Sequence, residues 1–202
     1  MGLSMTTTLA DFRKAAWMVL LTLVVSCHPG SKERIVIKTD LGDMVVEIET
    51  GTAPVTAKHF LSLVDRNVYT GSCFYRVVRP DNQPLNPVKI EVIQGGLLLD
   101  SLVEQFPSIP HEPTTATGIR HTDGVISMAR NEPGSASTEF FICLGDQPSL
   151  DFGGLRNPDG QGFSAFGRVI RGMEVARAIQ QQPDSVQMLL KPVRILEIRR
   201  AH

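Results

Sequence analysis

The alternation of apolar and polar residues along the chain predicts mainly short strands. Two β-rich runs, at 34–38 and 44–48, flank the turn-like sequence Thr39-Asp-Leu-Gly42, which is the pattern of a hairpin. Further strands are expected at 73–78, 88–93, 125–128, 139–143, 163–170 and 193–199. A long irregular stretch separates the fourth of these strands from the fifth. The pattern therefore indicates a chain dominated by strands.

Two segments instead have the spacing of amphipathic helices. Apolar side chains recur at helical intervals over 54–69, with a proline in the first turn and Thr52 or Ala53 near the cap. A second helix is expected over 172–182, where Pro183 ends it. Many strands with only two good helices favour a closed or nearly closed β-barrel with helices at its ends.

The N-terminal residues have the pattern of an export signal. A basic pair at 13–14 precedes an apolar run at 15–25, which is too short to cross a hydrocarbon core of about 30 Å. The run ends next to Cys27 and resembles a bacterial lipobox, in which cleavage before the cysteine exposes it to lipidation. A plain signal peptide with an incidental cysteine, or an uncleaved anchor, is the alternative. The expected organisation is a lipoprotein signal peptide, a tether and a folded domain, at residues 1–26, 27–32 and 33–202.

Composition narrows the chemistry. Apolar residues make up 42% of the chain and charged residues 20%, which is typical of a globular protein. The net charge of −1 argues against a dedicated nucleic-acid-binding protein. Three cysteines without a CxxC pair exclude a disulfide scaffold, and the histidines show no ligand spacing. The GxGxxA match at 160–165 follows a turn rather than a strand, so it does not indicate a dinucleotide site. Together with the histidine spacing, this leads us to expect no metal and no cofactor.

Several short motifs together carry the candidate chemistry. They are FYRVV at 74–78, QGG at 94–96, ISMAR at 126–130, EFFI at 139–142, LD at 150–151 and FGRV at 166–169. Taken singly, each is typical of a surface charge, a turn or a core strand. Taken in this order and with these gaps, they resemble the cyclophilin family of peptidyl-prolyl isomerases across roughly residues 33–200. The resemblance implies an eight-stranded antiparallel barrel capped by two helices.

The same resemblance implies roles for individual side chains. Arg76 matches the catalytic arginine, and Gln94 matches the glutamine that orients this arginine and the substrate carbonyl. Members of the apolar pocket for the proline ring are matched by Val92, Phe141 and Leu150, and the strand edge that binds the peptide backbone is matched by Ala129 and Arg130.

The chain also departs from the family pattern. Glu91 replaces an aromatic residue three positions before the glutamine, which removes one wall of the usual proline pocket unless the insert at 79–87 replaces it. Glu139 stands where glutamine is common, and it either pairs with Arg76 or competes with substrate for it. Phe163 stands where many members have histidine and adds apolar surface to the pocket.

The implied activity is rotation about X-Pro peptide bonds in unfolded exported proteins. The expected partners are proline-containing peptides and the membrane, reached through the lipid on Cys27, with the protein itself a monomer in the cell envelope. A secreted soluble form is the alternative location. The loop at 152–162 is expected to lie at the pocket rim and to influence specificity. The competing function is a binding module that holds proline-containing segments as a scaffold or chaperone without turnover.

Overall fold

The computed structural model describes residues 1–2 and 31–201. The lipidation site predicted at Cys27 lies outside these residues, as does nearly all of the predicted signal peptide. Among the described helices, none combines the length and the apolar character needed to span a bilayer.

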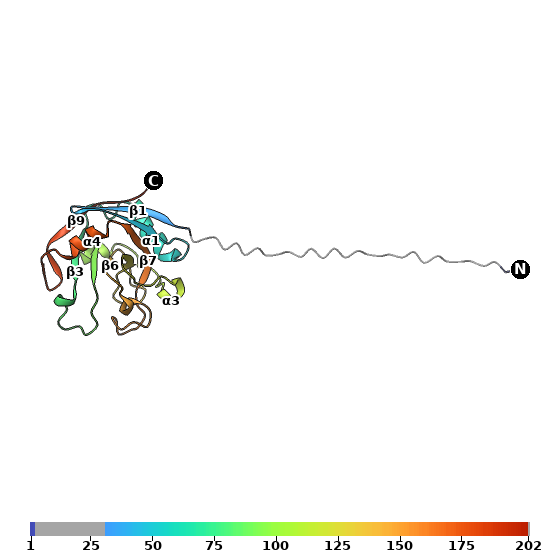
Figure 1. Cartoon of the computed structure of the whole chain (residues 1–202). Coiled ribbons are helices and arrows are strands. Elements are labelled where there is room, and N and C mark those ends of the chain that lie inside the picture. Colours follow the sequence, from blue (N-terminus) through green and yellow to red (C-terminus); the bar gives the residue numbers. More distant parts are fainter. Residues whose placement is uncertain (3–30, 202) are drawn as a thin grey trace.

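The strands form one antiparallel sheet that closes into a barrel (Figure 1). The order around the barrel is β1-β2-β7-β5-β6-β4-β3-β9, and pairing of β1 with β9 closes it. This confirms the predicted eight-stranded barrel; the two-residue β8 pairs only with β9. The strands are β1 Glu33–Thr39, β2 Gly42–Ile48, β3 Cys73–Val78, β4 Val92–Gly96, β5 Val125–Met128, β6 Phe140–Cys143, β7 Ser164–Arg171, β8 Asp184–Ser185 and β9 Met188–Arg200.

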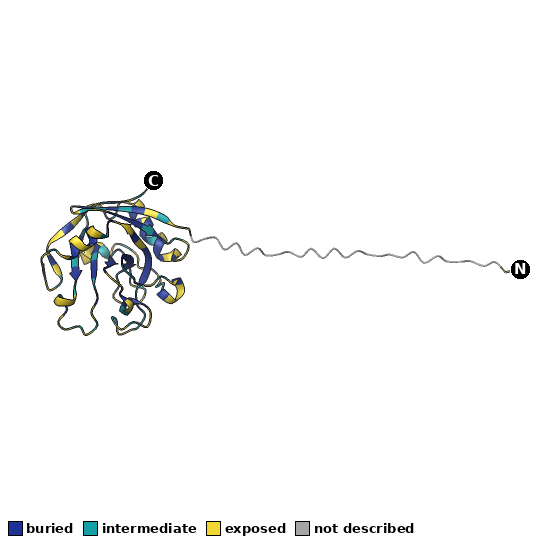
Figure 2. Ribbon diagram, in the orientation of Figure 1, coloured by how far each residue is buried: buried dark blue, intermediate teal, exposed yellow. Residues whose placement is uncertain are grey.

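The barrel is filled by a single large apolar core. Figure 2 colours long parts of the strand ribbons as buried residues. The aromatic centre of the core is formed by Phe60, Tyr69, Phe74, Phe140 and Phe166. Phe140 meets Phe60 and Tyr69 edge-on, with ring centroids 5.5 Å apart in each pair. Burying each such ring contributes about 1.5–3 kcal/mol, so these aromatic residues add substantially to a core whose other members are mainly aliphatic.

Two helices pack on the barrel, as predicted. α1 (Pro54–Asp65) lies against β7 and β9, and α4 (Met173–Gln180) lies against β2, β3 and β4. The shorter helical turns are α2 (Asp100–Val103), α3 (Thr114–Thr117), η1 (Pro80–Asn82) and η2 (Pro148–Leu150).

The ends of α1 differ from the sequence prediction. No side chain at Thr52 or Ala53 caps the helix; the distant carboxylate of Glu112 instead accepts the backbone N–H of Thr56 at 2.6 Å. The helix ends at Asp65 rather than near residue 69, because Asn67 adopts a left-handed φ of 56°. Tyr69 then turns inward and stacks on Phe60.

The strand predicted at 88–93 begins four residues later than expected, at Val92. The buried side chain of Gln83 explains the shift, because its amide takes the place of a neighbouring strand. Gln83 Nε2 donates to the Ile90 carbonyl at 2.7 Å, and the Ile90 N–H donates to Gln83 Oε1 at 3.3 Å. The backbone N–H and carbonyl of Ile90 are therefore hydrogen-bonded without a partner strand.

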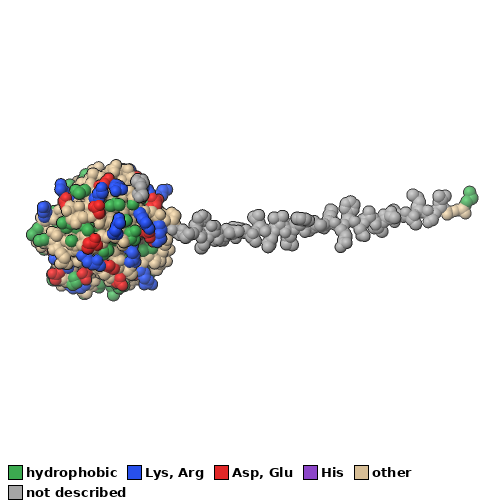
Figure 3. All heavy atoms as spheres, turned by 45° about the horizontal axis from the view of Figure 1, so that its top comes forward, with side chains coloured by type: hydrophobic (Ala, Val, Ile, Leu, Met, Phe, Trp, Pro, Cys, Tyr) green, Lys and Arg blue, Asp and Glu red, His purple; other side chains and the backbone are tan. Residues whose placement is uncertain are grey.

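Two long loops project from one end of the barrel, at the bottom of Figure 1. One joins β3 to β4 and contains the insert at 79–87; the other is the loop at 152–162. Arg156 of the second loop connects them, because its Nη1 donates to Gln83 Oε1 at 2.8 Å and to the Val88 carbonyl at 2.6 Å. On the face shown in Figure 3, basic and acidic side chains are interspersed, in keeping with the near-zero net charge.

Candidate active site

Every candidate catalytic or substrate-binding residue that the structure describes lines one hollow of about 480 Å³. All nine predicted catalytic and substrate-binding positions line it: Arg76, Val92, Gln94, Ala129, Arg130, Glu139, Phe141, Leu150 and Phe163. They come from β3, β4, β6, η2 and the residues that directly follow β5, precede β6 or precede β7, so segments far apart in sequence converge here. One wall is apolar and the other carries charged and amide groups.

The central charged group is Arg76, half-buried on β3. Its Nη1 donates to Gln94 Oε1 at 2.8 Å, as the sequence predicts for a glutamine that orients the arginine. Nε and Nη2 both donate to Gln187 Oε1, at 3.1 and 2.6 Å. Burial lowers the pKa of Arg76 from its usual value. Within residues 31–201 no carboxylate lies within ion-pair distance of this guanidinium, so its charge faces the hollow unneutralised.

The hydrogen bonds continue away from the arginine. Gln94 Nε2 donates to Tyr75 Oη at 2.7 Å, and Tyr75 Oη donates to Glu139 Oε2 at 2.5 Å. This chain fixes the amide orientation of Gln94, because its oxygen must face the guanidinium and its nitrogen must face the tyrosine. Tyr75 directly precedes Arg76 in the FYRVV motif, but no role was predicted for its hydroxyl from the sequence.

Glu139 follows neither of the two predictions made for it, which were pairing with Arg76 and competition with substrate for Arg76. Its carboxylate neither pairs with Arg76 nor projects freely into the hollow: Oε1 accepts the Leu97 N–H at 2.6 Å, and Oε2 accepts Tyr75. Burial raises the pKa of Glu139, and these hydrogen bonds partly oppose that shift. Gly96, at φ 147°, lets the carboxylate approach β4, because a Cβ there would clash with it. Glu139 thus anchors the arginine network from its far end.

The apolar wall is a small second cluster, separate from the barrel core. Phe141 forms its centre, and Phe163 meets Phe141 edge-on with ring centroids 5.3 Å apart. The remaining members are Val78, Ile90, Val92, Ala129, Cys143 and Leu150. A slot lined by one aromatic face and several branched aliphatic side chains suits a proline ring, which is compact and apolar.

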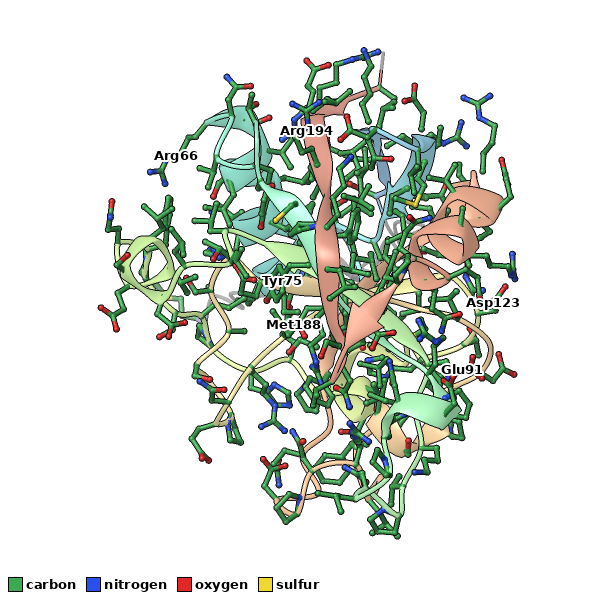
Figure 4. The ribbon with its side chains drawn as sticks, turned by 90° about the vertical axis from the view of Figure 1, so that its left-hand side faces the viewer. Arg66, Tyr75, Glu91, Asp123, Met188 and Arg194 are labelled. Atoms are coloured by element: carbon green, nitrogen blue, oxygen red, sulfur yellow. The ribbon has the colours of Figure 1, made fainter. Side chains whose placement is uncertain are left out.

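Glu91 takes no part in this wall. Its side chain accepts a hydrogen bond from Gln180 Nε2 at 3.4 Å, and Figure 4 shows it well away from Tyr75. The wall that an aromatic residue would have supplied is made instead by Ile90, which is 6% exposed, and by Phe163. Phe163 therefore adds apolar surface to this wall, and Ile90 lies outside the insert at 79–87.

A buried polar group supports the wall from behind. The His121 ring lies nearly parallel to Phe141, with ring centroids 6.0 Å apart. Its Nδ1 is 2.8 Å from Asp151 Oδ1, and its Nε2 is 3.0 Å from Ser127 Oγ. Burial alone would raise the pKa of Asp151, but hydrogen bonds from His121 outweigh it and lower that pKa. Because both ring nitrogens are satisfied, His121 holds Phe141 in place rather than offering a metal ligand.

The predicted peptide-binding edge follows β5. The Ala129 N–H donates to the Glu139 carbonyl at 2.8 Å, so the protein itself occupies that donor. The Arg130 side chain is 1% exposed; it pairs with Asp159 at 2.7 Å, and its guanidinium lies 5.1 Å from the centroid of the Phe163 ring. Hydrogen bonding to Arg130 lowers the pKa of Asp159 to about 2. The Arg130 side chain therefore braces the 152–162 loop and the pocket wall.

Two further site residues were not assigned from the sequence. Gln187, at the turn between β8 and β9, contacts the Arg76 guanidinium directly. Arg156 lines the same hollow as Arg76, and both burial and the charge of Arg76 lower its pKa. A β8–β9 hairpin was absent from the predicted elements, so nothing in the pattern could have placed Gln187. The only sequence signal for Arg156 is that it belongs to the 152–162 loop, which was expected to lie at the pocket rim.

Comparison with known proteins agrees with this geometry. The model of the cyclophilin type peptidyl-prolyl cis-trans isomerase family matches residues 34–200. A peptidyl-prolyl cis-trans isomerase from Acinetobacter baylyi is 31% identical over 192 residues, covering 92% of this chain and 95% of the relative. Peptidyl-prolyl cis-trans isomerase B of Escherichia coli is 29% identical over 147 residues, covering 72% of this chain and 83% of the relative.

Solved structures show the same fold. A cyclophilin type peptidyl-prolyl cis-trans isomerase from Cryptosporidium parvum superposes with a TM-score of 0.66 at 19% identity, covering 85% of this chain and 99% of that one. A second structure of that protein, determined in the presence of the dipeptide Ala-Pro, gives a TM-score of 0.64 at 20% identity, covering 84% of this chain and 99% of that one. With its closed barrel, its Arg76–Gln94 pair and the family match over 34–200, the chain belongs to the cyclophilin-type peptidyl-prolyl cis-trans isomerases.

Proposed function

We propose that this isomerase acts on X-Pro bonds of exported proteins at the bacterial cell envelope, anchored by a lipid on Cys27. The observation that carries the catalytic part is the position of Arg76 beside the Phe141 slot, in one hollow and without a carboxylate partner in the described chain. The basic pair, short apolar run and Cys27 support the location. The bacterial origin rests on similarity to bacterial relatives.

In this proposal the proline ring enters the slot of Phe141, Val92 and Leu150. The cis–trans barrier of about 18–20 kcal/mol arises from amide resonance, which rotation removes. The twisted nitrogen then has a localised lone pair and accepts a hydrogen bond more strongly than the planar one. The Arg76 guanidinium, placed over this nitrogen, stabilises the twisted state more than the planar state, and such differential binding lowers the barrier.

The energies require more than one group. A single well-placed donor in a site shielded from water contributes about 3–4 kcal/mol. A rate increase of 10⁵-fold needs about 7 kcal/mol. The remainder is assigned to gripping of the ring by Phe141 and to holding of the substrate carbonyl by Gln94. No proton transfer, nucleophile or metal enters these steps.

The catalytic part is tested by two-dimensional NMR exchange on an Ala-Pro-containing peptide with the full chain. We expect exchange cross-peaks between cis and trans forms at catalytic amounts of protein. Binding-induced shifts without exchange at millimolar peptide would instead support the scaffold or chaperone alternative.

The location is tested separately by mass spectrometry of envelope fractions. We expect a mature chain that begins at a lipidated Cys27, and a Cys27→Ser variant that is released from the membrane. An unmodified Cys27 in those fractions would contradict the lipid anchor while leaving the isomerase activity intact.

A further inference from the structure

The turn between β8 and β9 is strained at two successive residues. Val186 has a φ of 49° and Gln187 a φ of 75°, between the paired residues Ser185 and Met188. A two-residue hairpin with positive φ at both positions has the geometry of a type I′ turn, which strongly prefers Asn-Gly. A β-branched valine followed by glutamine is unfavourable there. The chain therefore holds a conformation for which its own residues are poorly suited.

Several contacts fix this turn beneath the active site. The Gln187 N–H donates to Asp184 Oδ2 at 3.0 Å, and its carbonyl accepts the Val77 N–H at 2.8 Å. Gln187 Nε2 donates to the Asn82 carbonyl at 3.1 Å. Asp184 is itself held by Arg79 and Asn82. The backbone N–H, the backbone carbonyl and the side-chain Nε2 of Gln187 are therefore all hydrogen-bonded. These bonds fix the direction of its side-chain oxygen.

The Gln187 side-chain oxygen points at the guanidinium of Arg76. Because it accepts both Nε–H and Nη2–H, it holds one edge of the planar group, while Gln94 holds Nη1. Three of the five N–H donors are then engaged, which leaves one N–H on Nη1 and one on Nη2 for a substrate. Gln94 alone would permit rotation about one nitrogen; two amides fix the plane of the group.

Both amides are neutral, which matters for catalysis. A carboxylate at the position of Gln187 would hold the same edge but would neutralise the charge that the substrate needs to meet. Figure 4 places Met188, the next residue, beside Tyr75, so the turn lies against the strand that carries the arginine.

We propose that Gln187 is a positioning residue, which the β8–β9 turn holds in a strained conformation so that the Arg76 fork faces the proline nitrogen. This inference rests on the catalytic role proposed for Arg76. It assigns a function to a turn that the sequence pattern left unassigned, and it explains why the strain is tolerated, since backbone strain of this kind is found where the surroundings and the function require it.

The test compares two substitutions to glycine in the full chain. Gln187→Gly relieves the backbone strain and removes the acceptor, whereas Val186→Gly relieves strain at an exposed neighbour and leaves the acceptor in place. We expect Gln187→Gly to lower kcat about tenfold with a smaller change in KM, because a hydrogen bond to a charged group in the site is lost. Val186→Gly should keep kcat within about twofold of wild type, because the acceptor for Arg76 remains.

Thermal unfolding and NMR separate this role from a structural one. Both glycine variants should keep or raise the melting temperature, and only Gln187→Gly should accelerate hydrogen exchange at Arg76 Nε. Gln187→Glu should retain slow exchange at Nε yet lose activity, since the acceptor remains and the charge is neutralised. Wild-type kcat in Gln187→Gly, with Arg76→Ala inactive, would overturn the positioning role and leave the proposed function standing; activity in Arg76→Ala would overturn both.

Discussion

Phe140 and Phe141, adjacent on β6, belong to two different compartments of the protein. Phe140 is fully buried in the barrel core, with its ring 5.5 Å from Phe60, whereas Phe141 lines the active-site hollow beside Phe163. Alternation along a strand requires this division, because successive side chains point to opposite faces. Neighbouring residues on one strand therefore contribute separately to the barrel core and to the wall of the candidate site.

Leucine substitutions should separate the two demands. Phe140→Leu should lower the free energy of unfolding by about 1–3 kcal/mol and leave KM of the folded protein unchanged, because it disturbs only the core. Phe141→Leu should destabilise less and raise KM about threefold to tenfold, because the flat face against the proline ring is lost. Urea unfolding and peptide kinetics measure the two effects. Equal effects of the two substitutions on KM would contradict the division.

The pH dependence of stability should contain a contribution from Glu139. Burial raises its pKa in the folded protein above the ordinary value, so the folded state binds more protons than the unfolded state between these two pKa values. In that window this contribution falls as pH rises. Glu139→Gln should remove the fall, so the variant should gain stability relative to wild type as pH increases from the ordinary glutamate pKa of about 4.3 towards neutrality.

Urea unfolding at several pH values tests this expectation. The matched control is Glu104→Gln, since Glu104 is an exposed carboxylate outside the network of Tyr75 and Gln94. A stability difference between Glu139→Gln and wild type that stays constant with pH, or that shrinks as pH rises, would show that Glu139 does not titrate as described.

Arg156 should influence which sequences around the proline are preferred. It lines the hollow together with Arg76, and its recorded acceptors are neutral oxygens of Gln83 and Val88. A glutamate next to the substrate proline should therefore raise kcat/KM about threefold over a lysine, as expected for a partly exposed charge pair. Arg156→Gln should abolish this preference.

Kinetics on peptides that differ only in the residue beside the proline provide the measurement. Raising the salt concentration should shrink the preference in the wild type, because exposed charges are screened. A preference that survives in Arg156→Gln would assign it to another group. The surface variant Arg177→Gln, on α4, serves as the matched control.

The closed barrel, and the grouping of the candidate site residues in one hollow, could be predicted from the sequence because both depend on local patterns and ordered motifs. Arg76, Gln94 and Phe141 lie within short runs whose order along the chain is itself informative. The β4 boundary could not be predicted, because the Gln83 side chain replaces a strand partner and no periodicity records such a contact. Gln187 was missed for a related reason: its turn lacks the usual Asn-Gly sequence and is held by tertiary contacts.

The role of Glu139 shows a different limit. Its residue type correctly indicated a departure at the site, but the partner could not be inferred, since Arg76 and Tyr75 are adjacent and face different groups. Only the geometry distinguishes an ion pair with the arginine from a hydrogen bond with the tyrosine. The charge of Glu139 therefore indicates a difference at the candidate site, but its hydrogen-bond partners can be identified only from the structure.

The most direct test of the account is the isomerisation rate of an Ala-Pro peptide with Arg76→Ala in the full chain. We expect kcat/KM to fall by about 10²–10³-fold with the fold intact, the loss typical of one preorganised donor. Arg76→Lys should recover little, because a point charge cannot engage Gln94 and Gln187 together while facing the substrate. A wild-type rate in folded Arg76→Ala would contradict the central claim that this guanidinium stabilises the twisted X-Pro bond.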